Sequence, residues 1–141
     1  MAYADKHIYV IFTAQHLLKN YLIKMFIDHG IKITPSHSTI LFLLEIYNTQ
    51  TMTDLGNILH LDNSTVTGLV DRLEKLGFVY RTDHPNDRRK WNVSISKEGL
   101  KEIAKAKVVI NRINKKIETG LSKKEMEVFH KVLSSFNEKF I

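Results

Sequence analysis

The sequence predicts a mainly helical protein with one small β-hairpin, an α+β fold. Two observations favour this class: apolar residues recur at three- and four-residue steps along most of the 141 residues, and only a short stretch alternates at every second residue. With 43% hydrophobic and 26% charged residues, the composition is typical of a globular protein. We therefore expect residues 1–141 to form a single domain.

The first two helices have clear boundary signals. Apolar residues keep the helical period over residues 8–26, and Gly30 ends the pattern. Thr34 can cap a second helix, and Pro35 then occupies the first helical position, where a missing N–H costs nothing. A short third helix is expected to begin at Thr53.

Next come a fourth helix and two strands. Asp62 can cap the helix, which ends at Gly77 and carries one apolar stripe: Val66, Leu69, Val70, Leu73 and Leu76. The third and fourth helices form a helix-turn-helix candidate over about residues 53–76. Strand-like segments at 78–82 and 91–95 then predict a hairpin, or wing, over about residues 78–95. This order is a winged helix-turn-helix pattern, here within residues 34–96.

The C-terminal part predicts two further helices. Ser96 can cap a long helix, and Ser122 with Glu125 forms a capping box for a last helix that continues to Phe140. Their apolar stripes have coiled-coil spacing, and packing within one chain would account for them. Together with the first helix, however, they supply more apolar surface than a small winged helix can cover. We therefore expect a homodimer joined through residues 1–33 and 97–141.

The central segment, TMTDLGNILHLDNSTVTGLVDRLEKLGFVYRTDHPNDRRKWNVSIS, resembles the MarR family of winged helix-turn-helix regulators. The likeness rests on STVTGLVDRLEKLG in the fourth helix and on Asp87, Arg89 and Ile95-Ser96 in the wing, where the family has Leu-Thr at the last pair. It extends to ITPSHSTIL and to the terminal helices. The resemblance implies a homodimeric DNA-binding transcription regulator, and we expect a repressor that a small aromatic or carboxylate effector releases.

The resemblance makes the fourth helix the recognition helix. Because its apolar stripe must face the core, we expect these DNA-binding residues on the outer face: Asn63, Ser64, Thr65, Thr67, Gly68 and Arg72. Short hydroxyl and amide side chains can contact phosphates or base edges, and a helix N-terminus attracts phosphate. The alternative is that this is an ordinary solvated helix face, on which Ser and Thr simply cap the start of the helix. Gly68 departs from the family, where a long basic residue is common, so we expect fewer contacts there.

The wing carries three consecutive cations, Arg88, Arg89 and Lys90, after the turn residues Pro85, Asn86 and Asp87. We expect the cations to meet phosphates or to enter a minor groove, where A·T tracts concentrate negative potential. Asp87 is expected to pair with Arg89, and the resemblance implies that Arg89 reaches the groove. Trp91 is expected to begin the strand that anchors the hairpin to the core. A solvated loop is the alternative.

Other chemistries have little support. The histidines lack a short ligand spacing such as H-x-x-x-H, so we predict no metal and no cofactor. The absence of cysteine excludes thiol chemistry, and no nucleophile elbow or phosphate-binding loop predicts an enzyme. Phe12, His16 and His37 are candidates for an effector pocket, because the first two helices of similar proteins border one. Packing is the alternative for both histidines.

Charge and hydropathy bear on the partners. The net charge is +6, but residues 62–91 hold six cations against five acids and residues 97–124 hold nine against three, so the winged region is nearly neutral. No apolar run approaches the roughly 20 residues of a membrane span, and we expect a cytoplasmic, nucleoid-associated protein. The expected partner is double-stranded DNA with a pseudo-palindromic operator. A sequence-tolerant architectural binder and a helical interaction module that has lost DNA binding remain alternatives.

Overall fold

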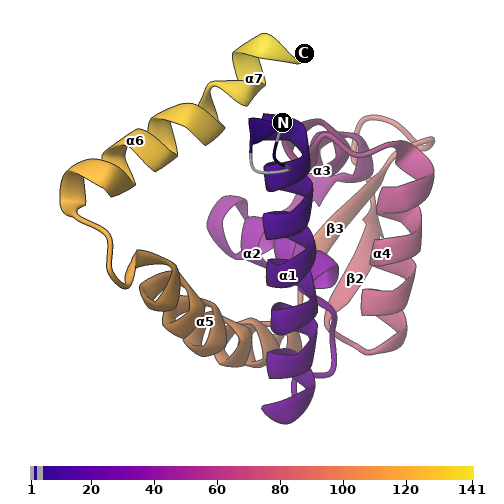
Figure 1. The fold of residues 1–141 in the computed structure, drawn as a ribbon. Coiled ribbons are helices and arrows are strands. Elements are labelled where there is room, and N and C mark those ends of the chain that lie inside the picture. The colour runs from indigo at the N-terminus through magenta and orange to yellow at the C-terminus, as the bar shows by residue number, and fades with distance from the viewer. Residues whose placement is uncertain (1, 3–4) are drawn as a thin grey trace. The chain divides into compact units, whose positions relative to one another are not determined.

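The computed structural model describes residue 2 and residues 5–141, which form two compact units, Met1–Val109 and Ile110–Ile141. The first unit contains α1 (His7–Asp28), α2 (Pro35–Tyr47), β1 (Gln50–Thr51), α3 (Met52–Leu59), α4 (Asn63–Lys75), β2 (Val79–Asp83) and β3 (Trp91–Ile95) (Figure 1). Helix α5 (Lys97–Glu118) begins in the first unit and ends in the second, which also contains α6 (Lys123–Ser134) and α7 (Phe136–Lys139). The prediction of a mainly helical chain with a small β-hairpin is confirmed.

Side-chain caps fix the starts of four helices where the sequence predicted them. Thr34 caps α2, Asp62 caps α4, and the Ser96 hydroxyl accepts a hydrogen bond from the first turn of α5. Ser122 and Glu125 form a capping box at the start of α6. These hydrogen bonds satisfy backbone N–H groups that have no partner inside the helix.

Two predicted helix boundaries were wrong. Helix α3 begins at Met52 instead of Thr53, because Thr51 has an acid three residues later and forms a capping box with Asp54. The last helix is not continuous to Phe140: α6 and α7 are separated at Ser135, whose hydroxyl donates to the backbone oxygen of Val132. Such a side-chain hydrogen bond competes with the regular helical pattern.

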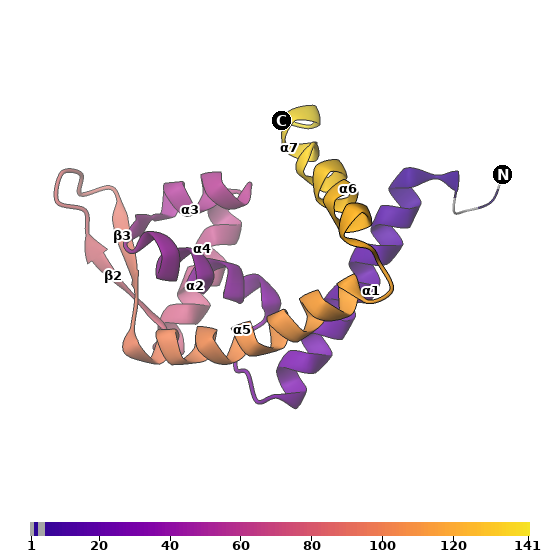
Figure 2. The ribbon, with the colours of Figure 1, turned by 90° about the vertical axis from the view of Figure 1, so that its left-hand side faces the viewer.

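The sheet is antiparallel and has the strand order β1-β3-β2. In the hairpin, Val79 pairs with Ile95 and Asp83 with Trp91, so residues 84–90 form the tip. Figure 2 shows this hairpin projecting beyond α3 and α4. Strand β1 was not predicted, because its two residues are too few to show alternation.

The core of the first unit buries one face of each element around the sheet. Leu55 of α3 and Val93 of β3 are fully buried, and the stripe of α4 is buried through Val66, Val70 and Leu73. This arrangement fixes which side of α4 is left outside. Among the described residues, no helix is both long and apolar enough to span a membrane.

Candidate nucleic-acid interface

Helix α4 presents a polar face to the outside. Asp71 is exposed on this helix, and so are the six α4 residues predicted for DNA contact: Asn63, Ser64, Thr65, Thr67, Gly68 and Arg72. Two of the hydroxyl groups already donate hydrogen bonds within the protein. The Ser64 hydroxyl donates to Asp62 Oδ1 at 2.8 Å, and the Thr67 hydroxyl donates to the Asn63 backbone oxygen at 2.7 Å.

The N-terminus of α4 is closed by a charged cap. Asp62 Oδ1 accepts a hydrogen bond from the Thr65 backbone N–H at 2.7 Å. That bond, with further hydrogen bonds from Ser64 and the Thr65 side chain, lowers the pKa of Asp62. An ionised Asp62 also suits the positive end of the helix dipole.

Arg81 of β2 connects the wing to α4. Its guanidinium pairs with Asp71 of α4, and its Nε lies 3.7 Å from Glu74 Oε2. The Arg81 side chain is only 21% exposed, so this cation is part of the α4–β2 packing. This role of Arg81 was not predicted from the sequence. The alternation of side chains along a strand could have indicated it, because Arg81 lies two residues after the buried Val79 and therefore faces the same side. A cation that faces inward needs an acidic partner.

The wing tip contains the predicted Asp87–Arg89 pair. Asp87 Oδ1 accepts hydrogen bonds from the Arg89 backbone N–H at 3.0 Å and from Arg89 Nε at 3.2 Å. These bonds lower the pKa of Asp87, with smaller contributions from the charges of Lys90 and His84. The Arg89 side chain is nevertheless 91% exposed. The tip therefore orients a cation that remains open to solvent.

His84 also shapes the tip, although the sequence analysis gave it no role. Its Nδ1 accepts a hydrogen bond from the Asn86 backbone N–H at 3.1 Å. Across the turn, the Lys90 backbone N–H donates to the Asp87 backbone oxygen at 3.1 Å. Pro85, between His84 and Asn86, is exposed, as is Arg88. The tip is thus ordered by local hydrogen bonds.

A groove of about 350 Å³ lies between the start of α4 and the wing. Its lining brings together four of the predicted DNA-binding residues, Asn63, Thr67, Arg89 and Lys90, with five others: Thr51, Met52, Thr53, Arg81 and Trp91. Trp91 begins β3, as predicted, and Val93 of that strand is fully buried in the core, whereas Trp91 itself is 45% exposed. Its partner Asp83 is the last residue of β2, so Trp91 lies at the tip end of the hairpin, beyond the buried Val93.

The three candidate effector residues lie in different local settings. Phe12 is 60% exposed on α1, and His16 Nε2 lies 3.1 Å from Asn20 Nδ2 on the same helix. His37 Nδ1 accepts a hydrogen bond from the Thr34 backbone N–H at 3.3 Å, so this histidine belongs to the α2 capping box. Burial, and secondarily the charge of Arg72, lowers the pKa of His37.

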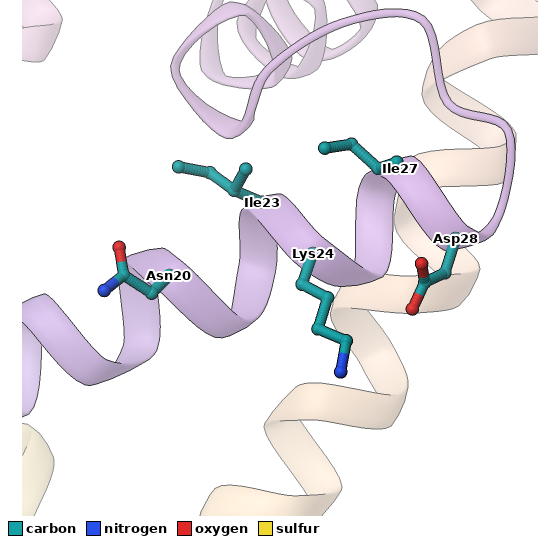
Figure 3. Close-up of a pocket in the computed structure, with 5 residues that line it drawn as sticks. All are labelled: Asn20, Ile23, Lys24, Ile27 and Asp28. Atoms are coloured by element: carbon teal, nitrogen blue, oxygen red, sulfur yellow. The ribbon is translucent and has the colours of Figure 1, made fainter.

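A shallow groove of about 330 Å³ runs along α1. Its lining residues are Asn20, Ile23, Lys24, Ile27 and Asp28, and Figure 3 shows the two isoleucines on one side of the helix with Lys24 and Asp28 on the other. All five lining residues belong to α1. In the described part of the chain, no group of three His, Asp or Glu side chains is placed to hold a metal ion.

Comparison with known proteins identifies similar sequences and folds. The MarR family model matches residues 33–91. The HTH-type transcriptional regulator PapX of Escherichia coli is 29% identical over 89 residues, which cover 60% of this chain and 54% of PapX. The chain thus spans about half the length of this curated relative.

Two solved structures share the fold over nearly the whole chain. The S. aureus MepR structure, a complex with DNA, has a TM-score of 0.86 at 20% identity and covers 96% of this chain and 98% of that one. The PcaV transcriptional regulator of Streptomyces coelicolor, in complex with its natural ligand, has a TM-score of 0.83 at 20% identity, with 98% and 96% covered.

Proposed function

Because the MarR family model matches residues 33–91, we propose that the chain is a member of the MarR family and a homodimeric, sequence-specific DNA-binding transcription regulator. In this proposal α4 lies in a major groove and Arg89 enters the adjacent minor groove. One observation supports the proposal most: two polar residues from the N-terminal half of α4, Asn63 and Thr67, line the same groove as two wing cations, Arg89 and Lys90. A helix and a neighbouring basic hairpin can then contact one DNA duplex together.

The wing geometry supports a role for Arg89 in particular. Its side chain is oriented by Asp87 yet is 91% exposed, so less conformational freedom is lost when it binds. Arg88 and Lys90 are also exposed and suit the flanking phosphates. Because the winged region is nearly neutral overall, placement of these cations should matter more than bulk charge.

Exposed apolar side chains on the terminal helices support dimer formation. On α1, Ile8, Phe12 and Leu17 are each more than half exposed. On α6, every residue is at least partly exposed, including four large apolar ones: Val128, Phe129, Val132 and Leu133. A second copy would remove such surfaces from water. A two-fold dimer would then bind a pseudo-palindromic site with half-sites about 34–36 Å apart.

The finer regulatory assignment follows from family likeness. We propose that the protein is a repressor and that a small aromatic or carboxylate effector releases it from DNA, as the natural ligand bound to PcaV suggests for a similar fold. Phe12, His16 and His37 remain the proposed contacts. An effector can act in this way only if it binds the DNA-free arrangement more tightly.

The test is a comparison of DNA affinities at fixed salt. Duplexes selected by the protein from a random library should bind at least about 1,000-fold more tightly than random duplex, whereas a ratio near one would make the protein an architectural binder. Absence of DNA binding would leave the interaction-module alternative.

An arginine variant tests the wing separately. Arg89→Ala should reduce affinity at least about tenfold and lower the salt slope by about one. Lys124→Ala on α6 removes the same charge far from the wing in sequence and serves as the control. Sedimentation should show dimers for all three proteins, and equal DNA binding by Arg89→Ala would contradict the wing assignment.

A further inference from the structure

We propose that the centre of α4 reads thymine methyl groups, so that the preferred half-site carries A·T pairs where Thr67 and Gly68 meet the major groove. The inference rests on the proposed function and deepens it. It assigns a base preference to the recognition helix and a specificity role to the two residues.

Gly68 leaves a gap in the middle of the exposed face. Helical spacing places it with Ser64 and Asp71, on the side opposite the buried Val66 and Val70. A Cβ built at Gly68 would have no described atom outside its own helix turn within 4 Å. A base edge can therefore approach the helix backbone more closely here than at any residue with a side chain.

The polar groups beside this gap are already engaged. The hydroxyl protons of Ser64 and Thr67 are donated to Asp62 and to the Asn63 backbone oxygen, and Asp71 is paired with Arg81. Guanine offers only acceptors in the major groove, so it needs a donor from the protein. The centre of the face does not supply one from these hydroxyls, and this disfavours guanine there.

Thr67 instead offers an apolar group. Its hydroxyl donates a hydrogen bond to the backbone oxygen of Asn63, four residues earlier. Because Thr67 is exposed, its methyl group is then the part of the side chain that is available to contact DNA. The C5-methyl of thymine is the apolar feature of the major groove, and threonine methyl groups are suited to contact it. Arg72 lies toward the other flank of α4 and could read a guanine there, so the inference is confined to the centre.

Replacement of thymine by deoxyuridine tests the inference directly, because only the methyl group is removed. In the site selected by the wild-type protein, at least one thymine per half-site should lose about fourfold in affinity when replaced, the value expected for one buried methyl group. The same replacement in flanking duplex outside the site is the control. Equal affinity at every position would overturn the inference and leave the proposed function intact, whereas failure to select any sequence would overturn both.

Two substitutions at Thr67 connect the effect to this residue. Thr67→Ser keeps the hydroxyl and removes the methyl, so it should lose the discrimination between thymine and deoxyuridine. Thr67→Val removes the hydroxyl and keeps the branched shape, so it should retain the discrimination. The reverse pattern would assign the preference to the hydroxyl and overturn the proposal.

A third substitution tests the gap. Gly68→Leu should weaken binding to the selected site at least about tenfold, because the new side chain fills the space that a base edge would occupy. Affinity equal to that of the wild type would overturn the role of Gly68.

Discussion

Asp87 holds Arg89 through three hydrogen bonds at the wing tip: from the backbone N–H at 3.0 Å, from Nε at 3.2 Å and from Nη2 at 3.4 Å. Asp87 and Arg89 are only two residues apart, and these hydrogen bonds fix the direction of the Arg89 guanidinium. Since Asp87 is 24% exposed and Arg89 91% exposed, the acid is partly covered while the cation stays available.

Removal of this acid should weaken DNA binding although it makes the protein more positive. Asp87→Ala frees Arg89 to adopt many rotamers, whose ordering then opposes binding. We expect DNA affinity to fall a few-fold, measured by fluorescence anisotropy, with little change in Tm. Asp83→Ala removes the same charge outside this hydrogen-bonded pair, and a gain in affinity for both variants would show that net charge outweighs orientation.

The cap of α4 predicts an acid-sensitive contribution to stability. Hydrogen bonds from Thr65 and Ser64 lower the pKa of Asp62 below the ordinary value of an aspartate, so the stabilisation is fully present above that ordinary value. It is lost as the pH falls through the lower, folded-state pKa. In thermal unfolding at pH 7, Asp62→Ala should lower Tm by a few degrees. When the pH is reduced below about 4, the Tm of this variant should fall less than the Tm of the wild type, because the variant has no Asp62 cap to lose.

A matched variant separates the cap from its charge. Asp62→Asn keeps an oxygen that can accept from the Thr65 backbone N–H, and Asn is as good a cap as Asp. Its Tm at pH 7 should stay close to that of the wild type, while its decline in acid should be reduced. A large loss at pH 7 would show that the negative charge itself, rather than the hydrogen bond, is responsible.

The sequence was most informative where structure is determined locally. Caps such as Thr34 and Asp62 are read from a residue type and a spacing, because the hydrogen bond is made within one helical turn. The stripe containing Val66 and Val70 likewise identified the buried side of α4. The polar face and the Asp87–Arg89 pair followed from these short-range patterns.

Long-range relationships were not predictable in the same way. The pairing of Gln50 with Val93, and the contacts of Arg81 with Asp71, depend on how distant segments meet. The exposure of Trp91 was not predicted either, because it depends on how far the hairpin extends beyond the core. Period two alone gives the face of a strand, but not its distance from the core.

Two glycines in helices should respond oppositely to a methyl group. Gly68→Ala adds the methyl to open space on α4, so the free energy of unfolding should rise by about 1 kcal/mol. In Gly99→Ala, the new Cβ would lie 2.1 Å from the Phe78 backbone oxygen, so the free energy of unfolding should fall by roughly 1–3 kcal/mol or more. Urea unfolding of both variants measures the difference, and destabilisation by Gly68→Ala would contradict the open position.

Glu102 of α5 should be important for the segment between α1 and α2. It is 3% exposed, and its Oε2 accepts a hydrogen bond from the Lys32 backbone N–H at 2.7 Å across 70 residues of sequence. Its Oε1 lies 3.8 Å from Lys105 Nζ. Glu102→Leu removes the acceptor and leaves this backbone N–H without its partner, so the free energy of unfolding should fall by about 1–3 kcal/mol.

Two controls test whether the hydrogen bond is responsible. Glu102→Gln keeps an acceptor oxygen and should lose less than Glu102→Leu, because the Lys32 N–H can still be satisfied. Glu98→Gln, at an exposed position one helical turn earlier, should change stability by no more than about 0.5 kcal/mol. Urea unfolding of the three variants gives the comparison. Equal losses for Glu102→Gln and Glu102→Leu would indicate that the charge interaction with Lys105, and not the bond to Lys32, stabilises this part of α5.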